Sequence, residues 1–310
     1  MKSFILALLF STLFITCNNA QENTEELENN EIYNLKLIKN NPYKQFKTLN
    51  DKRFDLSGIT SNGKDIFIIA DKEYNNKIYK IDTTTNNFRI LSEIELCTTS
   101  KIDYEGIDFY NNHFYIIEEW ENDIYKTEPT SCKLEKIDIN WKSLNIDDSD
   151  WGNKGLEGIA IDCENDILYI AKERQPRRVF SINLKTNEIS EPFKDIFYQN
   201  EEGYDISDMK FENKYLYILE RSKALVTRLD IKTKETKSVS FNTIVYNNGK
   251  RIYANKSPQY GMGEALLLSK NQIWIGLDNN GDMVSEYGKS LGLEQNTKTV
   301  ILIFERPDWF

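Results

Sequence analysis

The sequence predicts an all-β protein, and specifically a β-propeller of five four-stranded blades. Three observations lead to this prediction. Similar segments recur about every fifty residues, β-branched and aromatic residues fill them, and no long stretch shows apolar residues at helical spacing. Four short strands per unit at this period are typical of propellers. Six blades are the alternative, if residues 42–49 or part of residues 240–260 form additional strands.

Each repeat opens with a short strand, and a second apolar strand returns after a tight turn. The openings read LSGIT, YEGID, LEGIA, ISDMK and GEALL, and they begin at Leu56, Tyr104, Leu156, Ile206 and Gly263. The returning strands read DIFIIAD, HFYIIEE, ILYIAKE, YLYILER and QIWIGLD. In the first four repeats a third strand and an outer fourth strand follow. In the fifth, TVILIFE is the third strand, and we expect IYNLKLIK, residues 32–39, to pair with it as the outer strand and close the ring.

The first residues predict export. Residues 1–16 have the pattern of a signal peptide, because Lys2 precedes an apolar run that is too short to span a membrane. Cys17 then stands where a bacterial lipoprotein is acylated, and an ordinary secretory signal cut a few residues later is the alternative. Residues 17–31 have the composition of a disordered tether, and residues 32–310 form the predicted propeller domain. We expect the protein in the periplasm or on the outer membrane, with the lipid as its only membrane contact.

Charge and cysteine usage limit the function classes. A formal net charge of -10 argues against nucleic-acid binding. We also expect the protein to be a monomer. The cysteines lack metal-ligand spacing, so zinc is not expected. Cys132 and Cys163 both fall in short turns on one face and are the expected disulfide pair, whereas Cys97 should lie towards the other face. The only histidine, His113, also falls on the short-turn face, which argues against a Ser-His-Asp triad at the site.

Long connections identify the face of the ring that we expect to bind a ligand. Residues 140–154, 192–204, 240–261 and 279–298 all connect strands on one face. At this face each opening residue should lie beside the end of the returning strand. The openings supply Ser57, Glu105, Glu157, Ser207, Asp208 and Glu264, and the strand ends supply Asp71, Glu118, Lys172, Glu173, Glu220, Arg221 and Asp278. The sequence thus predicts a ring of carboxylates around the mouth of the central channel.

Carboxylates this close together need a counter-charge, because like charges raise one another's pKa. A hard cation such as Ca²⁺ is one neutraliser, and calcium is the cofactor that we expect. Ion pairs are the other, with the bases Lys172, Arg174, Arg177, Arg178 and Arg221. The expected metal ligands are Glu105, Glu157, Glu264, Asp278, Asp71 and Asp208, and the loop acids Asp147, Asp148 and Asp150 would extend the site. The structural alternative is that the adjacent glycines permit bulges and that the acids cap backbone amides of neighbouring blades.

The ordered motifs resemble the family called "esterase-like activity of phytase", a group of exported bacterial propellers, and the related SdiA-regulated periplasmic propellers. The similarity covers about residues 54–307. Its motifs appear here as Leu56-Ser57-Gly58, Glu105-Gly106, Asn153 to Gly158, Leu219-Glu220-Arg221 and Asp278-Asn279-Asn280. The last opening departs from the pattern, because Gly263-Glu264-Ala265 stands where Glu-Gly is expected.

Two functional hypotheses follow. The resemblance implies a calcium-dependent hydrolase of phosphoric or carboxylic esters. Its catalytic residues would be Glu105, Glu157 and Arg221, and an anionic small molecule or phosphoester would be bound by Lys172, Arg174, Arg178 and Glu220. The alternative is a non-catalytic surface lipoprotein that binds a small ligand, glycan or protein partner through loop aromatics such as Trp141, Trp151 and Tyr287.

Overall fold

The computed structural model describes six segments of the chain, namely residues 32–47, 52–72, 74–98, 103–149, 151–254 and 262–310. The predicted signal peptide, the tether and the lipidation site Cys17 lie outside these residues and stay predictions. Ile32–Phe310 form one compact unit. Among the described residues, no helix has the length and apolar character needed to cross a membrane.

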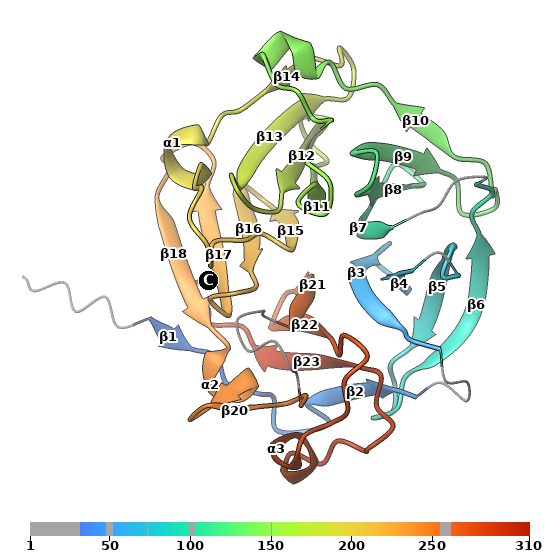
Figure 1. Cartoon of the computed structure of the whole chain (residues 1–310), viewed down its shortest axis with the longest axis vertical. Helices are drawn as coiled ribbons and strands as arrows, with labels where there is room; N and C mark the ends of the chain where they lie inside the picture. Colours follow the sequence, from blue (N-terminus) through green and yellow to red (C-terminus); the bar gives the residue numbers. More distant parts are fainter. Residues whose placement is uncertain (1–31, 48–51, 73, 99–102, 150, 255–261) are drawn as a thin grey trace, which may run out of the picture. The chain divides into compact units, whose positions relative to one another are not determined.

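Five sheets surround a central axis and confirm the five-bladed propeller (Figure 1). Blade one contains β3 (Asp55–Ser61), β4 (Ile66–Asp71), β5 (Lys77–Asp82) and β6 (Arg89–Glu95). Blade two contains β7 (Tyr104–Tyr110), β8 (His113–Glu118), β9 (Asp123–Thr127) and β10 (Glu135–Ile137). Blade three contains β11 (Leu156–Asp162), β12 (Ile167–Lys172), β13 (Arg178–Asn183) and β14 (Ile189–Ser190).

Blades four and five complete the ring. Blade four contains β15 (Asp208–Glu212), β16 (Tyr215–Glu220), β17 (Leu225–Asp230) and β18 (Thr236–Ser240). Blade five contains β21 (Gly263–Ser269), β22 (Gln272–Asp278), β23 (Thr299–Glu305) and β2 (Tyr43–Phe46). The connections carry a short hairpin, β19 (Tyr246–Asn247) and β20 (Lys250–Arg251), and four short helices: η1 (Trp141–Leu144), α1 (Lys194–Phe197), α2 (Asn242–Val245) and α3 (Glu286–Ser290).

The hydrophobic core lies between neighbouring blades. Ile69 of blade one packs with Ile107 and Ile116 of blade two, and a comparable cluster of buried apolar residues fills each of the other four interfaces. The innermost strands contact one another in the order β3, β7, β11, β15 and β21, and β21 returns to β3. Both faces of each sheet are therefore covered, which explains why the strands read as continuous apolar runs.

The ring is closed by pairing an N-terminal strand with the last strand of the chain, as predicted, but the segment differs from the expected one. Residues 43–46 form β2, which pairs antiparallel with β23, with Gln45 opposite Val300. The expected segment, residues 32–39, instead begins with β1 (Tyr33–Asn34), which pairs parallel with β18 of blade four. Leu35 is buried between blades four and five, so this segment passes from one blade to the next before β2 begins. Within the described part of this stretch, residues 43–46 therefore belong to blade five and do not form a strand of a sixth blade.

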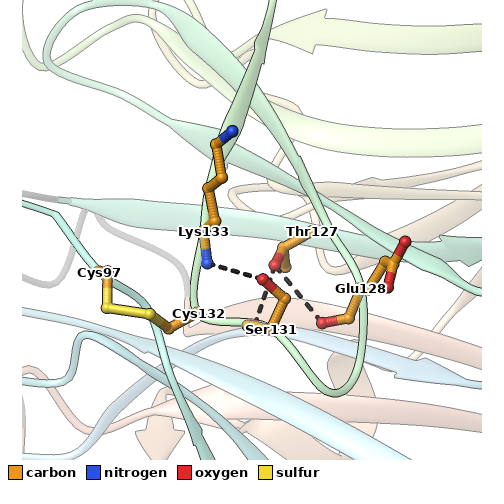
Figure 2. The surroundings of a disulfide bond; sticks show 6 residues. All are labelled: Cys97, Thr127, Glu128, Ser131, Cys132 and Lys133. Carbon is orange, nitrogen blue, oxygen red and sulfur yellow. Dashed lines mark hydrogen bonds between the residues drawn. A yellow bond between two sulfur atoms is a disulfide. The ribbon is translucent and has the colours of Figure 1, made fainter.

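A disulfide joins the outer parts of blades one and two (Figure 2). It links Cys97 to Cys132, whereas the sequence predicted the pair Cys132–Cys163; that prediction was wrong, and Cys163 is an exposed free thiol. The segment that follows β6 runs beside the segment before β10, and the amide of Cys97 donates a 2.8 Å hydrogen bond to the Cys132 carbonyl. This long-range pairing brings the two Cα atoms to 5.0 Å.

Candidate functional site

A β-bulge opens the innermost strand in four blades. The cross-strand register shifts by one residue at Ser57, Glu105, Glu157 and Glu264. A bulge sets two residues against one on the partner strand and redirects the extra side chain. The repeated acid is thus the extra residue of a bulge.

Serine and glutamate use the opening position differently. The Ser57 hydroxyl donates a 2.6 Å hydrogen bond to the Tyr104 carbonyl of the next blade, and Ser207 donates one of 2.8 Å to the Gly263 carbonyl. A carboxylate cannot donate such a bond. The acids at the other three openings, Glu105, Glu157 and Glu264, line a cavity instead.

This cavity has a volume of about 690 Å³ and receives side chains from all five blades. Among the described residues, four basic side chains line it: Arg53, Lys72, Arg174 and Arg221. Ten carboxylates line it as well: Asp55, Asp71, Asp103, Glu105, Glu119, Glu157, Glu173, Glu264, Asp278 and Asp282. The predicted gathering of acids at one end of the propeller is therefore present in the structure.

The residue just after the second strand points into the cavity in blades one to four. These residues are Lys72, Glu119, Glu173 and Arg221. Glu118 and Lys172 were also predicted to face the cavity, but they pair in register with Tyr104 and Leu156 and do not line it. A shift of one residue decides whether a side chain faces the cavity, because successive side chains on a strand point to opposite faces.

Arg221 is the electrostatic centre of the cavity. Its Nη1 contacts both Glu264 oxygens at 2.8 and 2.7 Å, and its Nε donates to Asp205 at 3.1 Å. The other guanidinium nitrogen pairs with Glu173, and Glu157 lies 3.8 Å from Nη1. One guanidinium therefore shares its charge among four carboxylates contributed by blades three and five and by the segment before blade four.

This arrangement leaves several acids with raised pKa values. Burial, followed by the neighbouring Asp103 and Glu157 carboxylates, raises the pKa of Glu105 well above its usual value. Burial also raises the pKa of Glu157 and Glu264, and in both cases it outweighs the opposing charge of Arg221. Burial raises the pKa of Glu119 to about 7. Without additional positive charge, part of this cavity holds protons at neutral pH.

Two groups of three carboxylates lie close enough to share one cation. Glu119, Glu157 and Glu173 form the first group, and Asp71, Asp103 and Glu105 form the second; within each group the carboxylate oxygens lie within 4.8 Å of one another. Glu173 is fully buried, and its Oε2 has no hydrogen-bond partner among the described residues. The first group thus has an oxygen with unused ligand capacity.

Three predicted ligand-binding residues lie outside the cavity. The Lys172 ammonium is buried and donates to the carbonyls of Lys154 and Arg174 at 2.7 and 2.5 Å, and burial lowers its pKa to about 8. Arg178 forms a two-bond pair with Glu191 at 2.8 and 2.5 Å. Glu220 is buried and accepts from Arg177 at 2.6 Å. Of the predicted ligand-binding residues, only Arg174 lines the cavity.

Asp208 also lies apart from the predicted metal ligands that line the cavity. Its two oxygens accept backbone hydrogen bonds from Met209 and Leu266, each 2.7 Å long, and it pairs with Lys210 at 3.2 Å. The Lys210 ammonium also reaches the Ile107 carbonyl of blade two at 3.1 Å. Asp208 therefore fits the structural alternative given above, in which an acid caps backbone amides of a neighbouring blade.

The loop residues singled out in the sequence have other contacts. Trp141 is buried against Trp151 and Phe180, so both tryptophans belong to the packing around blade three. Asp147 accepts two hydrogen bonds from Ser149 in an exposed turn. His113 is the first residue of β8, next to the short turn that follows β7, and it does not line the cavity. Asp148 does not line the cavity either, and Asp150 lies outside the described residues.

Sequence reasoning missed several cavity residues, among them Arg53, Asp55, Asp103 and Asp282. They lie just before the innermost strands, at the start of one, or in the loop after β22, where no repeat marks them. Glu119 had a signal, because it follows Glu118 at the end of a returning strand. To choose Glu119 over Glu118 from the sequence, one would have had to predict the bulge.

A family model described as "SdiA-regulated" matches residues 38–250, more than half of the chain. A chain from "Crystal structure of Nidogen/Laminin Complex" is 10% identical, with 80% of this chain and 84% of that chain covered and a TM-score of 0.47. The glutaminyl cyclase of Myxococcus xanthus is 8% identical, with 86% and 100% covered and a TM-score of 0.47. The hydrazine synthase of Kuenenia stuttgartiensis is 12% identical, with 76% and 58% covered and a TM-score of 0.41. Likeness to solved structures at this level carries no inference about the site.

Proposed function

The chain belongs to the SdiA-regulated family, and from this premise we propose that it is an exported β-propeller whose acidic cavity binds a divalent cation, with calcium preferred. Through that cation the cavity would bind an anionic small molecule, such as a phosphoester. The observation that carries the proposal is the lining of the cavity, where ten carboxylates face only four bases. Convergent acids in a concave site are unfavourable without a counter-ion.

The residues fit a hard cation. The acidic side chains that line the cavity all offer carboxylate oxygens as metal ligands, and oxygen is the ligand type that Ca²⁺ prefers. Glu119, Glu157 and Glu173 would hold the ion, since their oxygens converge and Glu173 Oε2 has no other partner among the described residues. Asp71, Asp103 and Glu105 offer a second set of ligands.

Hydrolysis of a phosphoric or carboxylic ester is the catalytic form of this proposal. A cation bound there would attract the ester and polarise its phosphoryl or carbonyl group. Burial raises the pKa values of Glu105 and Glu157, which suits these residues to hold or transfer a proton. Arg221 would orient the carboxylates that it contacts.

Binding without turnover is the second candidate. The observation that favours it is the pairing of Arg221, because four carboxylates already surround its guanidinium. Because its charge is already paired in this way, the Arg221 guanidinium can do little to stabilise the negative charge that develops in a transition state. Turnover assays decide between the two forms.

Export and a lipid anchor at Cys17 complete the proposal. The disulfide between Cys97 and Cys132 supports an oxidising compartment such as the periplasm, because such bonds rarely persist in the cytosol. Mass spectrometry of the protein from a membrane fraction would show the mass of a diacylated or triacylated cysteine at residue 17. A mature chain that begins further along, without lipid, would contradict the anchor.

Calcium titration tests the cation site. Metal-free protein should bind calcium in calorimetry and melt at a higher temperature with calcium than with magnesium, since binding to the folded state stabilises it. Glu157→Gln and Glu173→Gln should each weaken calcium binding at least about tenfold. Glu235 is exposed, lies between β17 and β18 of blade four and does not line the cavity. Glu235→Gln is therefore the matched control and should bind calcium as the parent does. Equal calcium affinity in all four proteins, or none in the parent, would sink the proposal.

Turnover is tested separately with p-nitrophenyl phosphate, p-nitrophenyl acetate and phytate. The catalytic form expects release of product that requires calcium and is lost in Glu157→Gln. Calcium binding without any turnover would leave the binding form and reject the hydrolase.

A further inference from the structure

A second cavity lies where the connection from blade four to blade five meets the long loop between β22 and β23 of blade five. Its volume is about 590 Å³, in the range of small-molecule pockets. The hairpin β19–β20 and the residues after it form one side, and α3 with Ser285 forms the other. It shares no lining residue with the acidic cavity.

The two loops are joined by backbone hydrogen bonds, so the pocket is a defined part of the fold. Tyr253 forms a β-bridge with Val284. The Ser285 amide donates to the Ile252 carbonyl at 2.9 Å, and the Ala254 amide donates to the Met283 carbonyl at 2.8 Å. Ile252, Tyr253 and Val284 are all buried in the cluster between blades four and five.

The charge of this pocket is opposite to that of the acidic cavity. Lys250 is exposed and makes no ion pair with a described residue, and the half-buried Arg251 guanidinium stacks on Tyr246 at 4.9 Å. Glu286 is the only acid among the described lining residues, and Lys289 pairs with it at 2.6 Å. In a chain with a net charge of -10, this is a local excess of positive charge.

A buried donor adds a second, independent feature. Tyr253 lines the pocket and is 1% exposed, and its hydroxyl makes no hydrogen bond to a described residue. Buried hydroxyls are almost always paired, and an unpaired one marks a place where a ligand atom or water can complete the bonding. Burial and, after it, the Asp278 carboxylate of the acidic cavity raise the pKa of this hydroxyl, so it keeps its proton and can donate it to an anionic oxygen.

We propose that this pocket binds the anionic oxygen group, phosphate or carboxylate, of a small molecule. Lys250 and Arg251 supply the charge, and Tyr253 supplies a buried hydrogen-bond donor. The site shares no lining residue with the cation site, although the Asp278 carboxylate of the acidic cavity acts on Tyr253. It is nonetheless close to it, because Asp282 lines the acidic cavity and Ser285 lines this pocket, and three residues span at most about 11 Å.

Titration of metal-free protein with inorganic phosphate, and in a parallel arm with citrate, tests the proposal. Calorimetry or the shift of amide resonances should show saturable binding, with a dissociation constant below about 1 mM for at least one of the two anions. Binding of phosphate alone identifies a phosphate site, and binding of citrate alone or of both identifies a carboxylate or a general anion site. Arg251→Gln should weaken binding at least about tenfold.

Tyr253→Phe separates ligand binding from folding. Its hydroxyl has no partner among the described residues, so its removal should leave the melting temperature equal or higher while anion affinity falls several-fold. Lys270→Gln, which removes an exposed lysine in the turn between β21 and β22 of the same blade, is the control and should bind as the parent does. Absence of binding for both anions, or unchanged affinity in Arg251→Gln and Tyr253→Phe, would overturn the proposal. Because no metal is present, this outcome is separate from that of the calcium titration.

Discussion

A glycine follows the bulged residue in blades one, two and three, and it sets how closely neighbouring blades approach. A Cβ on Gly106 would overlap the carbonyl oxygen of Glu157 in the next blade. At the equivalent Gly158, the nearest atom to such a Cβ is the flexible Met209 side chain at 3.0 Å. The repeated Glu-Gly pair therefore combines an acid for the cavity with a residue small enough for the interface between blades.

Substituting these glycines should give unequal losses of stability. Gly106→Ala should lower the free energy of unfolding by about 1–3 kcal/mol or more, because a backbone atom must move. Gly158→Ala should cost less, because Met209 can change rotamer. Urea denaturation of both variants measures the difference, and equal losses would contradict this account.

Glu119 predicts how stability depends on pH. Its pKa rises from 4.5 to about 7 on folding, so the folded state favours the protonated form. The stabilisation is complete below the unfolded value and is lost as the pH rises through about 7, at most about 3 kcal/mol. Metal-free protein should therefore lose stability between about pH 5 and pH 8.

The variant Glu119→Gln should flatten this pH dependence, because it cannot ionise. Calcium should act in the opposite direction, since it binds the ionised carboxylates, and its stabilising effect should grow across the same pH range. Chemical denaturation at several pH values, with and without calcium, measures both effects. A metal-free protein that becomes more stable towards pH 8 would refute the assignment.

At the scale of elements, the disulfide ties the chain that leaves blade one to the outer edge of blade two. The bond closes a loop with a sequence separation of 35 residues. Chain-entropy arguments give a stabilisation of about 3–4 kcal/mol for a loop of this length. Thermal melts of Cys97→Ser and Cys132→Ser should show this loss.

Cys163→Ser is the control for that experiment. Its thiol is free and exposed, so stability should change by less than about 0.5 kcal/mol. Reduction with dithiothreitol should destabilise the parent protein and leave the two disulfide variants unchanged. If Cys163→Ser lost as much stability as the other two, the pairing would be different.

At the scale of the whole molecule, Arg221 connects three blades through their acids. It extends from the end of β16 to Glu173 of blade three and Glu264 of blade five, and its side chain is 11% exposed. Removing one partner of a buried network leaves the other charges uncompensated. Arg221→Met should therefore destabilise the metal-free protein by about 3–5 kcal/mol.

Calcium should restore part of this loss, because a divalent ion can neutralise the same carboxylates. Arg89→Met is the matched control, since Arg89 forms a solvent-exposed pair with Asp82 and its removal should change stability little. Thermal and chemical denaturation with and without calcium compare the variants. Equal stability of Arg221→Met and Arg89→Met would show that the network does not hold the ring together.

The propeller could be predicted because its signal repeats. Each inner strand lies between two apolar layers, so LSGIT, YEGID and LEGIA had to look alike, and their spacing gave the blade count. Glu105, Glu157 and Glu264 followed from the same alignment and do line one cavity. Their roles in binding or catalysis stay predictions until a cation and a substrate are tested.

By itself the sequence determined the fold class, favoured five blades over six and predicted the gathering of acids at one end, because periodic apolar residues dictate which faces are buried. Only the tertiary structure decided that Glu119 faces the cavity in place of Glu118, and that of the predicted pair Lys172 and Glu173 only Glu173 does so. It also decided that residues 43–46 close the ring and that Cys97 pairs with Cys132. The physical reason is the same each time. A bulge shifts a strand by one residue, and contacts between distant segments depend on three-dimensional packing that leaves no mark in the local pattern.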